Sequence, residues 1–149
     1  MEDLLAINKF INNQKEGFDK FKNLGWSYIN IKNHFKKENN FSLAFFNSNK
    51  IIGLLLGDKI KNNNYFDLDI HIMLVSKNDR RRKIGTSLLN FIESNKKINN
   101  ISKIYLEVSE DNTDAIKFYE KNNFVFFRFR HNYYNNTENI NAKCYSKII

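Results

Sequence analysis

The chain changes character in its middle, where a strand pattern meets a helix pattern across a short charged segment. Tyr65–Val75 alternates apolar and polar side chains and becomes continuously apolar at Ile72–Val75, as in a strand that enters a core. The next apolar side chains recur on one face of a helix: Ile84, Leu88, Leu89, Ile92 and Ile98. The joint between them, Asp79–Leu89, carries three consecutive arginines, a lysine and a glycine. Because N–H groups at a helix start bear partial positive charge, this joint predicts a phosphate- or pyrophosphate-binding site.

Length and cysteine content limit the class of protein. The 149 residues predict one domain, residues 1–149, with a core of its own. The lone Cys144 cannot form an internal disulfide, and no charged-then-apolar leader opens the chain, so we expect a reducing, cytoplasmic setting. The best apolar run, Ile51–Leu56, is strand-sized, whereas a membrane-spanning helix needs about 20 residues. We therefore expect no membrane partner, and we interpret Cys144 as a small buried residue.

The charge balance is strongly basic. A formal net charge of +8 favours a polyanionic neighbour such as RNA, a ribosome or a phosphate-rich cofactor. The lysines are spread along the chain, so a solvated basic surface explains the charge equally well. His71 and His131 stand apart from cysteine and from clustered carboxylates, and we therefore predict no metal site.

The N-terminal third reads as helical. Its apolar side chains recur near a period of 3.6 residues: Leu4, Leu5, Ile7, Phe10, Ile11, Phe18, Phe21 and Leu24. Gly25 is expected to end this stretch. Ser27 is expected to cap a second helix that runs to Phe35, with Trp26 as the apolar staple in front of it.

The rest of the chain alternates strands with helices. Strands are predicted at Phe41–Phe46, Ile51–Ile60, Tyr65–Val75, Ile104–Val108, Phe124–Phe129 and Ala142–Ile149. A turn at Asn47–Asn49 makes the first two a hairpin, and Lys61–Asn64 forms the next turn. Asn112 opens a helix that ends near Lys121, and a polar, tyrosine-bearing stretch joins the last two strands. This order predicts a mixed α/β layer architecture with Tyr65–Val75 as its central strand.

The charged joint differs from the two common phosphate-binding loops. It holds only Gly85, whereas a P-loop and a dinucleotide-binding loop each need several glycines at fixed spacing. Its segment Arg80–Gly85 instead resembles the Arg/Gln-x-x-Gly-x-Gly/Ala signature of the GCN5-related N-acetyltransferase (GNAT) family, with Lys83 in place of the first glycine.

Further motifs support this resemblance. Leu106–Phe124 is similar to the family's strand-plus-helix signature, in which Leu-Glu-Val is followed by Asn-x-x-Ala and Tyr-x-x-x-Gly-Phe. Asn123 stands for that glycine, and asparagine tolerates a left-handed backbone better than most residues. Arg130–Tyr134 resembles the Arg-x-x-Tyr-Tyr element of the ribosomal-protein-alanine branch, which acetylates protein N-termini, and Gly25-Trp26-Ser27 looks like that branch's Pro-Trp-Ser.

The resemblance, which covers residues 40 to 149 best, implies a fold and an activity. The fold is a mixed, strongly twisted sheet of about six to seven strands, flanked by helices, whose fourth and fifth strands splay apart to admit acetyl-CoA. The activity is direct transfer of the acetyl group from acetyl-CoA to an amine, by a monomer or homodimer. The expected acceptor is a protein N-terminus, as in a ribosomal protein.

Two alternatives stay open. A related enzyme would acetylate a small amine, such as a polyamine or an aminoglycoside, or a lysine side chain, although such polycationic acceptors suit an acidic cleft better than a basic chain. A degenerate member would be an RNA- or ribosome-associated binding module, since fold does not determine function. Nucleic acid is not expected as a substrate.

The resemblance also implies which residues contact acetyl-CoA. The backbone of Met73, Leu74 and Val75 would pair with the pantetheine chain. The pyrophosphate would be held by the joint, through Arg80, Arg81, Arg82, Lys83, Ile84, Gly85 and Thr86. Asn112 would cap its helix and hydrogen-bond the cofactor, although capping alone explains its presence.

Proton transfer is assigned to two residues. Glu107 faces the cleft if Leu106 and Val108 face the core, and the resemblance implies that it is the general base, acting through water. Tyr119 is implied as the general acid that protonates the CoA thiolate, because a phenol is normally protonated at neutral pH. Tyr133 and Tyr134 would line the peptide entrance, and packing roles explain these two equally well.

Overall fold

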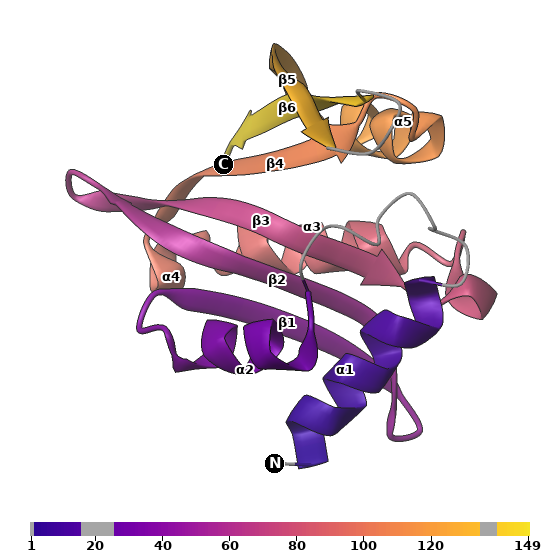
Figure 1. Cartoon of the computed structure of the whole chain (residues 1–149). Helices are drawn as coiled ribbons and strands as arrows, with labels where there is room; N and C mark the ends of the chain where they lie inside the picture. The colour runs from indigo at the N-terminus through magenta and orange to yellow at the C-terminus, as the bar shows by residue number, and fades with distance from the viewer. Residues whose placement is uncertain (1, 16–25, 135–139) are drawn as a thin grey trace.

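The computed structural model describes residues 2–15, 26–134 and 140–149 (Figure 1). The helices are α1 (Glu2–Lys15), α2 (Tyr28–Lys36), the short 3₁₀ helix η2 (Lys77–Asp79), α3 (Ile84–Ser94), α4 (Lys96–Asn99) and α5 (Thr113–Lys121). The strands are β1 (Asn40–Asn47), β2 (Lys50–Asn62), β3 (Tyr65–Val75), β4 (Ile101–Ser109), β5 (Val125–Tyr134) and β6 (Ile140–Ile148). The predicted features at Phe18, Phe21, Leu24 and Gly25 lie outside these residues.

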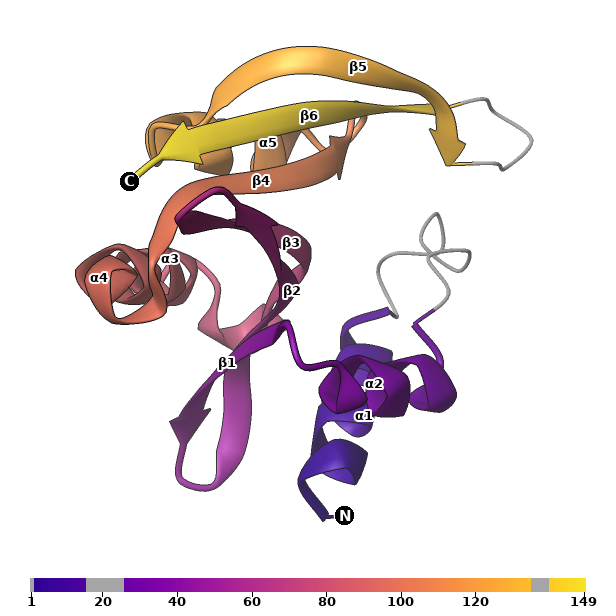
Figure 2. The same ribbon diagram turned by 90° about the vertical axis from the view of Figure 1, so that its left-hand side faces the viewer.

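The strands form one mixed sheet flanked by helices. Its order is β1-β2-β3-β4-β6-β5, and among the described strands only the β3·β4 pair is parallel. A parallel pair needs a crossover connection, which α3 and α4 supply. Figure 2 shows α1 and α2 on one side of β1–β3 and α3 and α4 on the other. The predicted mixed α/β sheet, with β3 in its interior, is confirmed.

Two apolar cores cover opposite faces of the sheet, because alternate residues of β2 point to opposite sides. Leu55 joins the core beneath α3 and α5, together with Leu88 and Ile116. Leu54 and Leu56 join the core beneath α1 and α2. The strand therefore reads as continuously apolar, as expected for burial on both faces.

β3 and β4 separate after a short paired segment. Their register runs from Phe66 opposite Ile101 to Ile70 opposite Leu106, and within the described residues it ends there. Beyond it the two strands diverge (Figure 1), and the edge of Ile72–Val75 that faces β4 has no strand partner in the described sheet. These are the strands expected to splay, numbered third and fourth here because the described sheet begins at Asn40.

A β-bulge interrupts the pairing of β2 with β3 next to this divergence. Leu56 pairs with Ile72 and Gly57 with Ile70, so the intervening His71 has no β2 partner in the register. A Cβ on Gly57 would lie 2.5 Å from the backbone oxygen of Asp69, so the close approach of the strands requires glycine. Bulges redirect side chains, and this one lies beside the opening between β3 and β4.

The predicted helix caps and the predicted left-handed end of α5 are confirmed. The Ser27 hydroxyl accepts from the N–H of Asn30 at 3.3 Å, and Asn112 Oδ1 accepts from the N–H of Ala115 at 3.2 Å. Asn123 has a φ of 64° and donates its N–H to the carbonyl of Glu120, while Phe124 donates to Tyr119. This pair of bonds ends α5 in a Schellman motif with asparagine in the left-handed position.

Some predicted boundaries and faces are wrong. Arg130–Tyr134, predicted as part of a connection, continues β5, because this is an edge strand of the described sheet, where the polar Arg130, His131 and Asn132 can stay exposed. β2 runs on to Asn62, so the following turn is two residues shorter than Lys61–Asn64. Ile98 is 84% exposed because a break after Ser94 turns α4 away, and Leu5 is 56% exposed.

No helix in the described segments is both long and apolar enough to cross a membrane.

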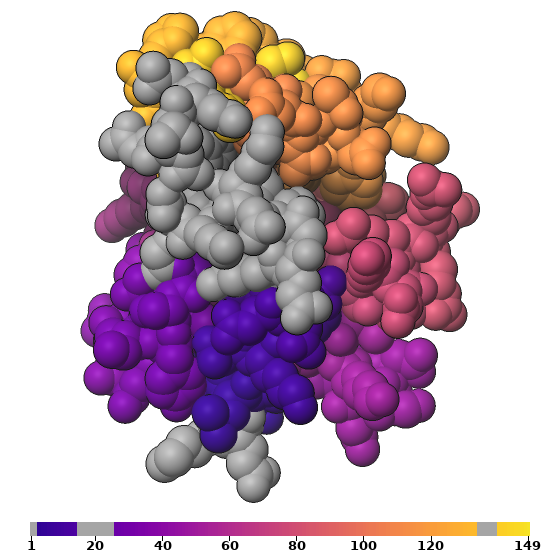
Figure 3. Space-filling model, turned by 45° about the vertical axis from the view of Figure 1, so that its right-hand side comes forward, coloured from indigo at the N-terminus to yellow at the C-terminus, as the bar shows by residue number. Residues whose placement is uncertain are grey.

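The space-filling view shows the α5 and β6 side of the molecule above the α1 and α2 side (Figure 3).

Candidate active site

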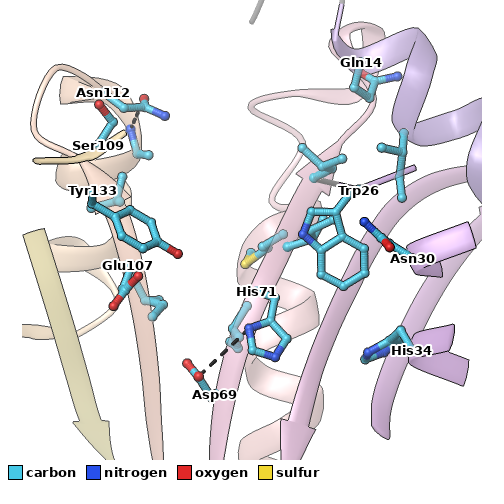
Figure 4. Close-up of a pocket in the computed structure, with 18 of the residues that line it drawn as sticks. Gln14, Trp26, Asn30, His34, Asp69, His71, Glu107, Ser109, Asn112 and Tyr133 are labelled. Carbon is cyan, nitrogen blue, oxygen red and sulfur yellow. Dashed lines mark hydrogen bonds and ion pairs between the residues drawn. The ribbon is translucent and has the colours of Figure 1, made fainter. Parts of the chain in front are cut away.

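A cavity of about 700 Å³ opens where β3 and β4 diverge. Side chains from α1, α2, β3, β4, α5 and β5 line it, and Figure 4 shows β4 and β5 residues facing those of β3 and α2. The lining includes six of the predicted site residues: Met73, Leu74, Glu107, Asn112, Tyr119 and Tyr133. The described lining does not include Val75, which follows on β3, or the segment Arg80–Thr86.

Glu107 extends from β4 into the cavity (Figure 4), because Leu106 and Val108 on either side of it are buried in the core. Its two carboxylate oxygens accept from Arg130 Nη1 at 3.0 and 3.3 Å. The Cys144 thiol donates weakly to Oε1 at 3.8 Å. The predicted burial of Cys144 is confirmed, and its side chain contributes to the surroundings of Glu107.

Tyr133 completes this group from β5. The guanidinium of Arg130 lies over its ring, 4.2 Å from the centroid. Burial, the charge of Glu107 and a hydrogen bond with that carboxylate raise the pKa of Tyr133. The backbone of Tyr134 pairs with Ile140, while its side chain lies outside the described part of the chain.

Tyr119 and Asn112 reach the cavity from α5 and its cap. The Tyr119 ring packs edge-on against Phe118 and Phe124, with centroid distances of 5.3 and 5.6 Å. Burial raises the pKa of Tyr119 to about 12, so the phenol remains protonated at neutral pH and can only donate its proton. Within the described part of the chain its hydroxyl makes no hydrogen bond. Asn112 uses Oδ1 for the cap, which leaves its amide nitrogen for a ligand.

The charged segment lies between η2 and α3, at the end of β3. Arg80, Arg81, Arg82 and Lys83 are all exposed, and Arg82 is paired with Asp79 at 2.6 Å. Gly85 lies where α3 passes close to its neighbours: a Cβ there would lie 3.0 Å from the Phe118 ring and 3.2 Å from Met73, so these side chains would have to shift. Lys83 is the N-cap of α3 and makes no side-chain capping bond.

Lys83 has the backbone conformation that favours glycine, with a φ of 62°. A left-handed conformation costs an L-residue about 1–2 kcal/mol, so Lys83→Gly is expected to raise the free energy of unfolding by about 1 kcal/mol. Thermal unfolding should show a Tm increase of about 2–4 °C. Lys83→Ala is the matched control, because it removes the same charge but keeps the Cβ. A Lys83→Gly variant no more stable than Lys83→Ala would contradict this prediction.

The cavity also holds a cluster that the sequence interpretation missed. Asp58 Oδ2 accepts from Lys37 Nζ at 2.7 Å and lies 3.2 Å from His71 Nε2, while Asp58 Oδ1 lies 3.4 Å from Nδ1 of the buried His34. His34 Nε2 lies 3.3 Å from the Ser42 hydroxyl. The available signal was the alternation of Asp67, Asp69 and His71 along a strand that enters a core.

Electrostatics differ among the members of this cluster. Burial lowers the pKa of His34. The charge of Asp58 opposes this shift, whereas Lys37 and His71 add to it, so His34 is neutral at neutral pH. Burial favours the neutral form of Asp58, but hydrogen bonds from Lys37 and His71 outweigh it and lower the pKa of that carboxyl. Among the described residues, no three His, Cys, Asp or Glu side chains form a group suited to bind a metal ion.

Comparison with known proteins gives a family and a fold. The sequence matches the acetyltransferase (GNAT) family over residues 4–124. No curated protein matches it. The ribosomal-protein-S18-alanine N-acetyltransferase from Escherichia coli superposes with a TM-score of 0.80 at 19% identity, over 100% of this chain and 89% of that chain.

Two plant structures are also similar. Arabidopsis thaliana NAA60 in complex with a bisubstrate analogue has a TM-score of 0.78 at 16% identity, over 99% of this chain and 93% of that chain. Arabidopsis thaliana Naa50 in complex with the bisubstrate analogue CoA-Ac-MVNAL has a TM-score of 0.64 at 29% identity, over 71% of both chains. The fold of this chain is therefore shared with structures that hold bisubstrate analogues.

Proposed function

This chain belongs to the acetyltransferase (GNAT) family and is an acetyl-CoA-dependent N-acetyltransferase, and from that premise we propose that its acceptor is the α-amine of a protein N-terminus. The observation that carries the proposal is that Glu107, Tyr133 and Tyr119 line one cavity beside the unpaired edge of β3. This arrangement offers a carboxylate for an incoming ammonium, a phenol for a departing thiolate and a backbone edge for an extended ligand.

The acetyl-CoA side of the site lies at the end of β3. The edge of Met73–Val75 that faces β4 can pair with the amide groups of pantetheine, and Asn112 has a free amide nitrogen nearby. A lysine carries no hydrogen-bond acceptor, so Lys83 leaves the first N–H groups of α3 for a ligand. Cations at a helix N-terminus are unfavourable because that end of the helix is itself positive. A bound pyrophosphate would offset the repulsion by placing negative charge between the helix end and Arg80–Lys83.

In the reaction the acceptor nitrogen loses two protons, and the departing sulfur takes one. Glu107, acting through water, removes a proton from the acceptor ammonium, and the neutral amine attacks the acetyl carbonyl. The C–S bond then breaks, the thiolate takes the phenolic proton of Tyr119, and the second proton lost by the attacking nitrogen restores the phenol. The products are the N-acetyl amide and free CoA, with one proton released to solvent.

The choice of acceptor draws on the structural neighbours and on Tyr133. The E. coli neighbour is a ribosomal-protein-S18-alanine N-acetyltransferase, and the Naa50 complex holds the bisubstrate analogue CoA-Ac-MVNAL. Tyr133, beside Glu107, offers a rigid amphipathic side chain to a peptide backbone. The chain's net charge of +8 disfavours polycationic small amines.

An acceptor panel tests the proposal. The full chain is mixed with acetyl-CoA and with peptides whose N-terminus is free or blocked, a lysine peptide and a polyamine, while thiol release and peptide mass are measured. Acetylation only of peptides with a free N-terminus supports the proposal. Faster acetylation of lysine or polyamine would overturn it, and a lack of turnover with every acceptor would favour a binding module.

A further inference from the structure

His71 lies on the wall of the cavity opposite Glu107 (Figure 4). It is the residue that the β3 bulge leaves outside the register with β2. Its side chain is 31% exposed, so the ring contacts both the cavity and solvent. The bulge thus places an imidazole on the wall of the cavity.

Carboxylates lie on two sides of the His71 ring. Nε2 lies 3.2 Å from Asp58 Oδ2, and Nδ1 lies 3.9 Å from Asp69 Oδ2. The ring also lies 6.2 Å from the Trp26 ring, measured between centroids. The charged or titratable groups around it are, element by element, His34 of α2, Lys37 directly after α2, Asp58 of β2, Asp69 of β3, Glu107 of β4, and Arg130 and Tyr133 of β5. The two carboxylates therefore lie one beside each ring nitrogen of His71.

Glu107 is less available than His71 as the final acceptor of a proton. Both of its oxygens already accept from Arg130, and the Cys144 thiol and Tyr133 hydroxyl also contact the carboxylate. Burial raises the pKa of Asp69; His71 opposes this shift and the charge of Glu107 adds to it. Asp69 therefore interacts electrostatically with Glu107 across the cavity. His71, which lies opposite Glu107 and between Asp58 and Asp69, is therefore placed to receive the proton that Glu107 removes.

We propose that His71 receives the proton that leaves the acceptor amine. Glu107, acting through water, removes the proton from the ammonium, and a ring nitrogen of His71 then receives that proton through the same water. The amine then attacks the acetyl carbonyl, and the thiolate takes its proton from Tyr119, which the second proton of the attacking nitrogen restores. The imidazolium releases the first proton to solvent at the exposed edge of the ring. This inference rests on the proposed N-acetyltransferase function and identifies where its proton goes.

The test compares His71→Gln with His131→Gln. His131 is an exposed histidine on β5 that stacks on Phe129 outside the cavity, so it is the matched control. We expect His71→Gln to lower kcat/KM for the acceptor about 100-fold, with KM for acetyl-CoA unchanged. The acidic limb of its pH profile should move up toward the pKa of a free α-amine, about 7.7–8.0, because only the pre-formed neutral amine can then react. His131→Gln should retain both the rate and the profile.

Rescue separates a chemical role from a structural one. Added imidazole should restore activity to His71→Ala at least tenfold and leave His131→Ala unchanged. His71→Gln with the rate and pH profile of the unsubstituted chain would overturn the inference while leaving the proposed function intact, and so would a slow His71→Ala variant that imidazole does not rescue. A lack of turnover in the unsubstituted chain would overturn both.

Discussion

Tyr119→Phe is expected to lower kcat about 100-fold or more, which is the usual scale for loss of a general acid. The ring contacts with Phe118 and Phe124 remain in this variant, so the fold should be retained. The phenol acts on the thiolate only as the C–S bond breaks, and KM for acetyl-CoA should therefore stay within about twofold. Steady-state thiol release with a free N-terminal peptide measures both constants.

Tyr145→Phe is the matched control for this prediction. Burial and the Glu120 carboxylate raise the pKa of Tyr145 to about 12. Its hydroxyl donates to Glu120 at 2.9 Å, and neither residue lines the cavity. Loss of that bond should lower the free energy of unfolding by about 1 kcal/mol and leave kcat unchanged. If Tyr119→Phe turned over as fast as Tyr145→Phe, the assignment of the acid would be wrong.

Glu107→Gln should lower kcat/KM for the acceptor about 100-fold, since the amide keeps the shape of the side chain but loses the charge that attracts the ammonium. The effect should fall on the acceptor and not on acetyl-CoA, which distinguishes it from a general loss of binding. Arg130 is left without this carboxylate, but because it is a largely exposed residue the stability cost should be small. Initial rates at varied peptide concentration measure the effect.

Glu93→Gln is the control for the Glu107 variant. Glu93 pairs with Lys147 at 2.6 Å and does not line the cavity. Its replacement should leave kcat/KM unchanged. Equal rates for the two glutamine variants would show that the Glu107 carboxylate takes no part in the transfer.

Local patterns predicted the elements of the fold well, because each depends on neighbouring residues in the chain. The Ser27 and Asn112 caps follow from side chains that accept from backbone three residues later, and the end of α5 follows from the tolerance of Asn123 for a left-handed backbone. The burial of Leu106 and Val108 follows from strand alternation, and so does the projection of Glu107 to the other face. The failures at Ile98 and Arg130–Tyr134 occur where an element's environment depends on partners distant in the sequence.

What the sequence by itself determined is the order of elements, the family and the residues that could carry a proton, because these depend on residue type and spacing. Only the tertiary structure decided which of them meet. The divergence of β3 from β4 creates the cavity, and the partners Arg130, Cys144 and Tyr133 reach Glu107 from strands that follow it in the chain. The bulge opposite Gly57 turns His71, an isolated histidine in the sequence, toward Asp58 and the cavity. Strand register and side-chain approach set these contacts, and they depend on how segments far apart in the chain pack together.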